Sequence, residues 1–110
     1  MSNSRLEKLQ EFLTESPDDS FLLFALAKEY EGNGNSEKAL ATYLHLQKTN
    51  EQYVGLYFHL AKLYERMEQA QQAWDTYCKG MAVAKTEGDQ HAYSELAGAR
   101  LNLGDEEDFE

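Results

Sequence analysis

The chain has 110 residues, and its 10 Lys and Arg against 20 Asp and Glu give a formal net charge of −10 at pH 7. This excess of negative charge repels phosphate backbones and anionic headgroups, which disfavours nucleic acid and membrane surfaces as partners. With 42% apolar and 12% aromatic residues, one Pro and seven Gly, the composition disfavours both a disordered chain and an all-β chain rich in turns.

A single cysteine, Cys78, excludes an internal disulfide, as is typical of a reducing compartment. The N-terminal residues are polar and lack the apolar stretch of a signal peptide. No run of about 18 apolar residues occurs, so we expect no membrane span. A soluble, cytoplasmic protein is therefore expected.

The first expected helix covers residues 4–16, and a turn with Pro17 follows it. Its apolar side chains recur at helical spacing and share one face. They are Leu6, Leu9, Phe12 and Leu13.

Residues 20–53 and 54–87 are two copies of one 34-residue pattern. They share ten identical residues, where chance would give about two. The identical pairs are Leu22/Leu56, Phe24/Phe58, Leu26/Leu60, Ala27/Ala61, Lys28/Lys62, Tyr30/Tyr64, Glu31/Glu65, Ala39/Ala73, Thr42/Thr76 and Tyr43/Tyr77.

Each copy predicts two helices joined by a tight turn. In the first copy, Leu-Ala-x-x-Tyr from residue 26 and Ala-x-x-x-Tyr from residue 39 place apolar side chains on one helical face. We expect helices over 20–32 and 36–49, with Ser36 as the N-cap of the second. The second copy predicts helices over 54–67 and 70–87. The recurring alanines are small enough to let paired helices approach to about 8 Å.

Within 70–87, we expect Trp74 in the core and Cys78 as a small, half-buried side chain. Gly80 lies in the middle of this helix, where glycine costs about 1 kcal/mol relative to alanine. It is expected to allow close approach by a terminal helix over 89–102. The last six residues, 105–110, hold five of the twenty acids and are expected to form a solvated tail.

The 34-residue period, the Leu-Ala-x-x-Tyr motif, the Gly-Asn turn and the Ala-x-x-x-Tyr motif resemble the tetratricopeptide repeat. Glu68 in place of the turn glycine and Gly80 in place of an alanine depart from it. The resemblance implies an all-α, right-handed α-solenoid of stacked antiparallel helix hairpins, with about six helices. Residues 1–104 would form one domain, made of a half repeat (4–19), two repeats (20–53 and 54–87) and a capping helix (89–102).

No motif for catalysis, metal binding or a cofactor is present. His45, His59 and His91 are isolated in sequence, and no phosphate-binding or nucleophile-elbow pattern occurs. We therefore expect no enzyme activity, no metal site and no cofactor.

The resemblance implies a concave groove, lined by the first helix of each hairpin, that holds a peptide or helix of a partner protein. The residues expected to line it are Phe24, Lys28, Glu31, Phe58, His59, Lys62, Glu65 and Arg66. Such a surface suits an acidic segment with an apolar anchor. A carboxylate clamp of the kind known in this family is not expected, because Phe24 and Phe58 stand where that subtype has lysine.

An alternative reading of these residues is purely structural. The two phenylalanines would then pack inside the stack, and Lys28–Glu31 and Lys62–Glu65 would be ordinary surface pairs.

We therefore expect an adaptor or scaffold that binds another protein. The alternative function is a self-associating structural unit, in which a second copy covers an apolar end that includes Leu6, Leu9 and Phe12. A further hypothesis places the acidic tail in the groove, in cis or from a neighbouring molecule.

Overall fold

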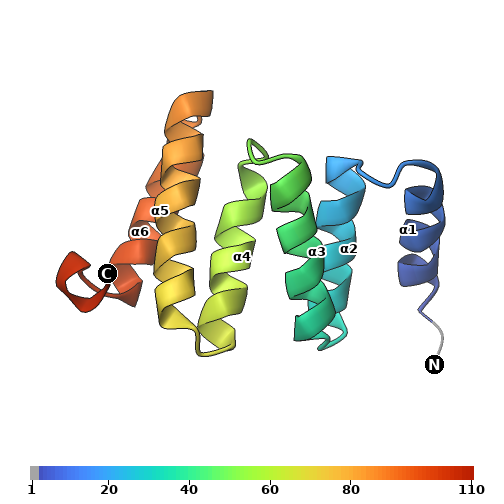
Figure 1. The fold of residues 1–110 in the computed structure, drawn as a ribbon, viewed down its shortest axis with the longest axis horizontal. Coiled ribbons are helices and arrows are strands. Elements are labelled where there is room, and N and C mark those ends of the chain that lie inside the picture. The colour runs from blue at the N-terminus through green and yellow to red at the C-terminus, as the bar shows by residue number, and fades with distance from the viewer. Residues whose placement is uncertain (1–2) are drawn as a thin grey trace. The chain divides into compact units, whose positions relative to one another are not determined.

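The computed structural model describes residues 3–110, and over these residues the chain is helical with no strand (Figure 1). It divides into two compact units, Met1–Glu51 and Gln52–Glu110. The first contains helices α1 (Ser4–Glu15), α2 (Ser20–Gly32) and α3 (Ser36–Thr49). The second contains α4 (Gly55–Arg66), α5 (Ala70–Glu87), α6 (Gln90–Leu103) and a short 3₁₀ turn, η1 (Glu106–Asp108).

The predicted helices are confirmed, and so is the all-α fold class. Three of the six begin and end at the expected residues, and the other three differ by one residue at one or both ends. One capping prediction is wrong. Asn35, rather than Ser36, is the N-cap of α3, and its side chain accepts a hydrogen bond from the backbone N–H of Lys38 at 3.2 Å.

In the first unit, α2 packs against both α1 and α3. Its small residue Ala27 is fully buried, as is Ala39 of α3, and their size allows the two helices to lie close together. Polar contacts fix α1 beside α2: Arg5 Nε lies 2.9 Å from Glu29 Oε1, and the Gln10 amide donates to the Tyr30 hydroxyl at 3.3 Å.

In the second unit, α5 packs against α4 and α6. Ala61, Ala73 and Tyr77 are fully buried, and Trp74 is 6% exposed, so its predicted place in the core is confirmed. Cys78 is half-buried, also as predicted.

The turns inside the two hairpins have the same backbone conformation although their sequences differ. Gly34 has a left-handed φ of 77°, and Glu68, at the equivalent place in the second copy, has φ 59°. Equivalent hydrogen bonds close both turns, from Asn35 N–H to the Tyr30 carbonyl and from Gln69 N–H to the Tyr64 carbonyl, each at 2.9 Å. The second turn therefore keeps the geometry of a glycine turn at some conformational cost to Glu68.

The tail does not form the fully solvated segment that its composition predicts. Residues 105–108 are exposed, but the following ring of Phe109 is half-buried against α5. No helix among residues 3–110 has both the length and the apolar character needed to cross a membrane. A cytoplasmic location stays a prediction.

Gly80 allows a close approach, but the nearest neighbour differs from the one expected. A Cβ added at Gly80 would lie 2.5 Å from the Cβ of Tyr57 on α4, and 3.1 Å from Leu96 on the terminal helix α6. The Cβ of Tyr57 is attached directly to the backbone of α4, and its side chain is fully buried, so it cannot shift unless α4 shifts as well.

We expect Gly80→Ala to lower the free energy of unfolding by about 1–3 kcal/mol, because the clash outweighs the gain in helix propensity. Gly98→Ala on α6 is the matched control. A Cβ there meets nothing within 4 Å, so this change should raise stability by up to about 1 kcal/mol. Urea unfolding followed by circular dichroism measures both; equal effects of the two substitutions would contradict the packing argument.

Candidate functional site

One side of α2 forms an apolar surface edged by charge. Phe21, Phe24, Ala25 and Lys28 recur at helical spacing and line a depression of about 430 Å³ together with Arg5 and Glu29. Phe21 is 63% exposed, which is high for a phenylalanine. We call this surface the α2 face.

Two of the predicted site residues, Phe24 and Lys28, belong to the α2 face. Phe24 is half-buried, and its ring lies 6.3 Å from that of Tyr43 at an angle of 58°. Lys28 is exposed. Phe24 therefore combines packing inside the hairpin with a surface open to solvent.

The prediction missed Phe21. Phe21 does not recur at an offset of 34, because the equivalent residue in the second copy is Gly55. A signal was nevertheless present, since Phe21 precedes Phe24 by three residues and so falls on the same side of the helix.

In the second unit, Phe58, His59 and Lys62 lie on the equivalent side of α4, which we call the α4 face. The rings of Phe58 and His59 meet edge to face at 5.7 Å, and Lys62 Nζ lies 5.7 Å from the centroid of the Phe58 ring. Lys62 also forms an ion pair with Glu65, with 3.7 Å between Nζ and Oε2. The structural alternative of a Lys62–Glu65 surface pair is therefore realised here. Arg66, the last residue of α4, is exposed.

Glu31 and Glu65 make the same contact in the two hairpins. Glu31 accepts a hydrogen bond from the Tyr43 hydroxyl, and Glu65 accepts one from the Tyr77 hydroxyl. Both tyrosine side chains are fully buried, and in each hairpin the bond joins the first helix to the second. Each of these two carboxylates therefore links the two helices of its own hairpin. The prediction that they line a groove did not include this structural role.

Burial raises the pKa of the Tyr77 hydroxyl above its ordinary value of 10.0, and the hydrogen bond to Glu65 and the negative charge of that carboxylate raise it further. The hydroxyl therefore stays protonated and keeps donating to Glu65 throughout the neutral range.

Within residues 3–110, no group of three or more His, Cys, Asp or Glu side chains is placed to hold a metal ion. Two of the three histidines each lie beside one carboxylate: His45 Nε2 is 3.1 Å from Asp18 Oδ1, and His91 Nε2 is 3.7 Å from Glu95 Oε2. The surfaces described above can thus contribute apolar contact, ring stacking and charge.

Comparison with solved structures identifies the family. A tetratricopeptide repeat domain protein from Salinibacter ruber, solved in solution, is 45% identical in sequence, with a TM-score of 0.77 over 79% of this chain and 88% of its own. A crystal structure of a tetratricopeptide repeat domain protein from the same organism, also 45% identical, gives a TM-score of 0.74 over 77% of this chain and 96% of its own. The chain belongs to the tetratricopeptide repeat family.

More distant structures share the fold of this tetratricopeptide repeat protein. A protein from Bordetella parapertussis is 24% identical, with a TM-score of 0.79 over 94% of this chain and 89% of its own. PcrH, solved in complex with the chaperone binding region of PopD, is 14% identical, with a TM-score of 0.82 over 89% of this chain and 74% of its own. No family model and no curated protein matches the sequence.

Membership of this family supports the general prediction of a protein-interaction module, because tetratricopeptide repeats typically provide surfaces for other proteins rather than catalytic sites. The roles of the individual residues on the α2 and α4 faces stay predictions.

The Tyr77–Glu65 bond makes a prediction about pH. At pH 8 Tyr77→Phe should cost about 1.5–3 kcal/mol, because it removes a hydrogen bond to a charged group. In the unfolded chain Tyr77 has the ordinary tyrosine pKa of 10.0, and below this pH its protonated hydroxyl contributes fully to the stability of the fold. Above it the unfolded chain loses this proton first, so the contribution falls by about 1.4 kcal/mol per pH unit until the folded pKa is reached.

The stability gap between wild type and Tyr77→Phe should therefore narrow between pH 9 and pH 11, as measured by urea unfolding at each pH. Tyr93→Phe, which removes the hydroxyl of a half-buried tyrosine of α6, is the matched control and should cost less at pH 8. A gap that stays constant or widens over this range would contradict the linkage.

Proposed function

We propose that this chain is an adaptor or scaffold that binds a peptide or helix of a partner protein through the α2 face and the α4 face. The observation that carries the proposal is the exposed Phe21 beside Phe24 and Lys28, in a depression of the size that an anchoring side chain occupies. Exposure of an aromatic ring to water is unfavourable, and contact with an apolar side chain of a partner would bury the ring and lower the free energy.

The recurrence of Phe and Lys on the α4 face supports the same proposal. Phe58 and Lys62 reproduce the pair formed by Phe24 and Lys28, so each face offers a ring next to a cation. A partner segment with an aromatic or aliphatic anchor and neighbouring acidic residues complements both features. The capture of a PopD region by PcrH is an example of a protein of this fold that binds a segment of another protein.

A charge reversal tests the proposal. Lys28→Glu combined with Lys62→Glu should weaken partner binding at least about tenfold, because it replaces attraction for an acidic segment with repulsion at both faces. The matched control is Lys48→Glu combined with Lys85→Glu, which makes the same change in net charge at exposed positions of α3 and α5.

Both double variants and the wild type would be used for affinity capture from the native cell extract, and the captured partner would then be titrated by calorimetry. Binding that is lost in both double variants would reflect net charge alone. Unchanged binding by the Lys28→Glu, Lys62→Glu variant would show that the partner binds at another surface.

Self-association is the second candidate function, and one observation favours it. Phe12 is 57% exposed at a depression of about 380 Å³ that also includes Leu9 and Lys8 of α1. A second copy that covered this apolar end would remove Phe12 from water.

If this surface joins two copies, light scattering should give a dimer for the wild type and a monomer for Phe12→Asp. Leu101→Asp is the control, because Leu101 is a comparably exposed leucine (71%) on α6 and its replacement should leave the dimer intact. A wild-type monomer at all concentrations, or a dimer that Phe12→Asp does not dissociate, would exclude this function for α1.

A further inference from the structure

The C-terminal residues fold back onto the second unit and end against α5. After α6 the chain turns, forms η1, and loops back toward the helices (Figure 1). Its Phe109 ring meets Trp74 of α5. A reciprocal pair of contacts between Asp105 and Asp108 closes the turn, including a hydrogen bond from Asp105 N–H to Asp108 Oδ2 at 2.9 Å. The hypothesis that this tail lies in cis in the groove of the first hairpin helices is therefore wrong, because Phe109 packs on Trp74 of α5. Its placement in the groove of a neighbouring molecule stays a prediction.

The anchoring contact is a ring stack with a cation beside it. The Phe109 ring lies 4.5 Å from the Trp74 ring with only 10° between their planes. The guanidinium carbon of Arg100, on α6, lies 4.9 Å from the centroid of the same Trp74 ring. The backbone N–H of Glu110 donates to Gln71 Oε1 at 3.2 Å, so the tail is held by its main chain as well as by a ring.

The residues that contact the tail also make hydrogen bonds within α5 and between α5 and α6. Gln71 donates its amide N–H to Asp75 Oδ1 at 3.0 Å, one turn along α5, which leaves its carbonyl oxygen to accept from Glu110. Arg100 donates to Cys78 Sγ at 3.3 Å, which holds the guanidinium near Trp74. The site thus has an aromatic platform, a cation and a hydrogen-bond acceptor, and each of them also contacts another residue of α5 or α6.

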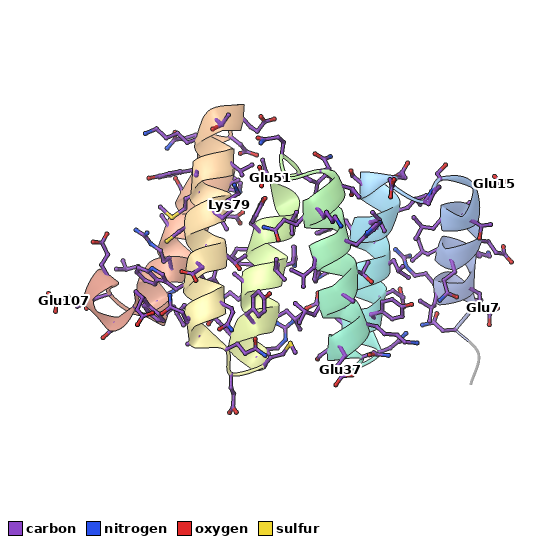
Figure 2. The ribbon with its side chains drawn as sticks, viewed as in Figure 1. Glu7, Glu15, Glu37, Glu51, Lys79 and Glu107 are labelled. Carbon is purple, nitrogen blue, oxygen red and sulfur yellow. The ribbon has the colours of Figure 1, made fainter. Side chains whose placement is uncertain are left out.

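The tail itself is attached at few points. Residues 105–108 are exposed, and Glu107 points away from α5 and α6 (Figure 2). Beside the Trp74–Phe109 stack, a depression of about 340 Å³ lined by Trp74, Arg100 and Leu101 extends along α6. A segment that is held by one ring and one backbone bond, next to open space, can be replaced by a similar segment from another molecule.

We propose that Trp74, Arg100 and Gln71 form a second binding site, separate from the α2 and α4 faces, for an acidic segment of a partner protein that carries an aromatic residue. The chain's own tail occupies this site in cis and competes with the partner. The seated tail shows the chemistry that fits: a ring for Trp74, a backbone N–H for Gln71 and negative charge near Arg100.

Trp74 is the only tryptophan of the chain, so its fluorescence reports directly on this site. The probe is a synthetic peptide with the sequence of residues 105–110, Asp-Glu-Glu-Asp-Phe-Glu, and the control peptide has Ala in place of Phe. The proteins are the wild type and full-length Phe109→Ala, which keeps the chain length but removes the stacked ring.

Phe109→Ala should shift Trp74 emission to longer wavelength, and the probe peptide should reverse that shift with saturation. A tethered tail has an effective concentration on the order of 1 mM, so a tail that is mostly bound in cis implies a dissociation constant in trans of about 1 mM or below. The wild type should bind the peptide roughly tenfold more weakly, because its own tail must leave first. The control peptide should have no effect.

Gly104→Ala is a second variant that is expected to displace the tail from the site. A Cβ at Gly104 would lie 2.9 Å from the Phe109 ring and 3.0 Å from Asp108 Oδ2, so the substitution displaces the ring without removing it. This variant should show the same spectral shift and the same gain in affinity for the peptide. Circular dichroism verifies that both variants keep their helices.

The proposal would be overturned if Phe109→Ala gave no saturable response up to several times the effective concentration. Equal affinity of the wild type and the variants for the peptide, or equal binding of the two peptides, would also overturn it. A wild-type dimer that Phe109→Ala converts to a monomer would also overturn it, since the tail would then bind a second copy. Because Lys28 and Lys62 are unchanged throughout, failure here leaves the proposed function of the α2 and α4 faces standing.

Discussion

The close approach of two helices inside each hairpin is the constraint on which the rest of the structure depends. The paired helices carry fully buried alanines, Ala27 and Ala39 in the first hairpin and Ala61 and Ala73 in the second, whose small size allows the helices to lie close together. That proximity brings a buried tyrosine of the second helix within reach of a glutamate of the first, and the resulting hydrogen bond appears in both hairpins. Beside this buried side, α2 and α4 each carry a half-buried phenylalanine and, one turn further on, a lysine, which are the residues of the α2 face and the α4 face.

Internal repetition made the helices predictable, and it did so for a physical reason. Two segments that must bury the same face against the same kind of neighbour keep the same residues at the same spacing, as Leu26/Leu60 and Tyr43/Tyr77 do. The similarity extends to the turn at Glu68, where the backbone has the left-handed conformation of Gly34 although the side chain differs. Local hydrogen bonds and the required helix crossing determine that conformation more strongly than the intrinsic preference of one residue.

What the sequence could not provide were contacts between residues that the repeat does not relate. The pairing of Gly80 with Tyr57 depends on which side of α5 meets α4, and a glycine in isolation does not identify the neighbour that requires it. The tail is a similar case. Five acids in six residues indicate a solvated segment, and only the position of Trp74 at the end of its path explains why Phe109 returns to the helices.

Differences between the copies are therefore as informative as the identities. Two differences between the copies place a large aromatic ring in one copy alone. Phe21 against Gly55 gives the α2 face its exposed ring, and Trp74 against Leu40 gives α5 the platform on which the tail rests. Both are large aromatic residues at positions where the sister repeat needs only a small or aliphatic one, so packing within the hairpin does not demand them. Contact with another segment, from this chain or from a partner, is what their size and aromatic character can serve.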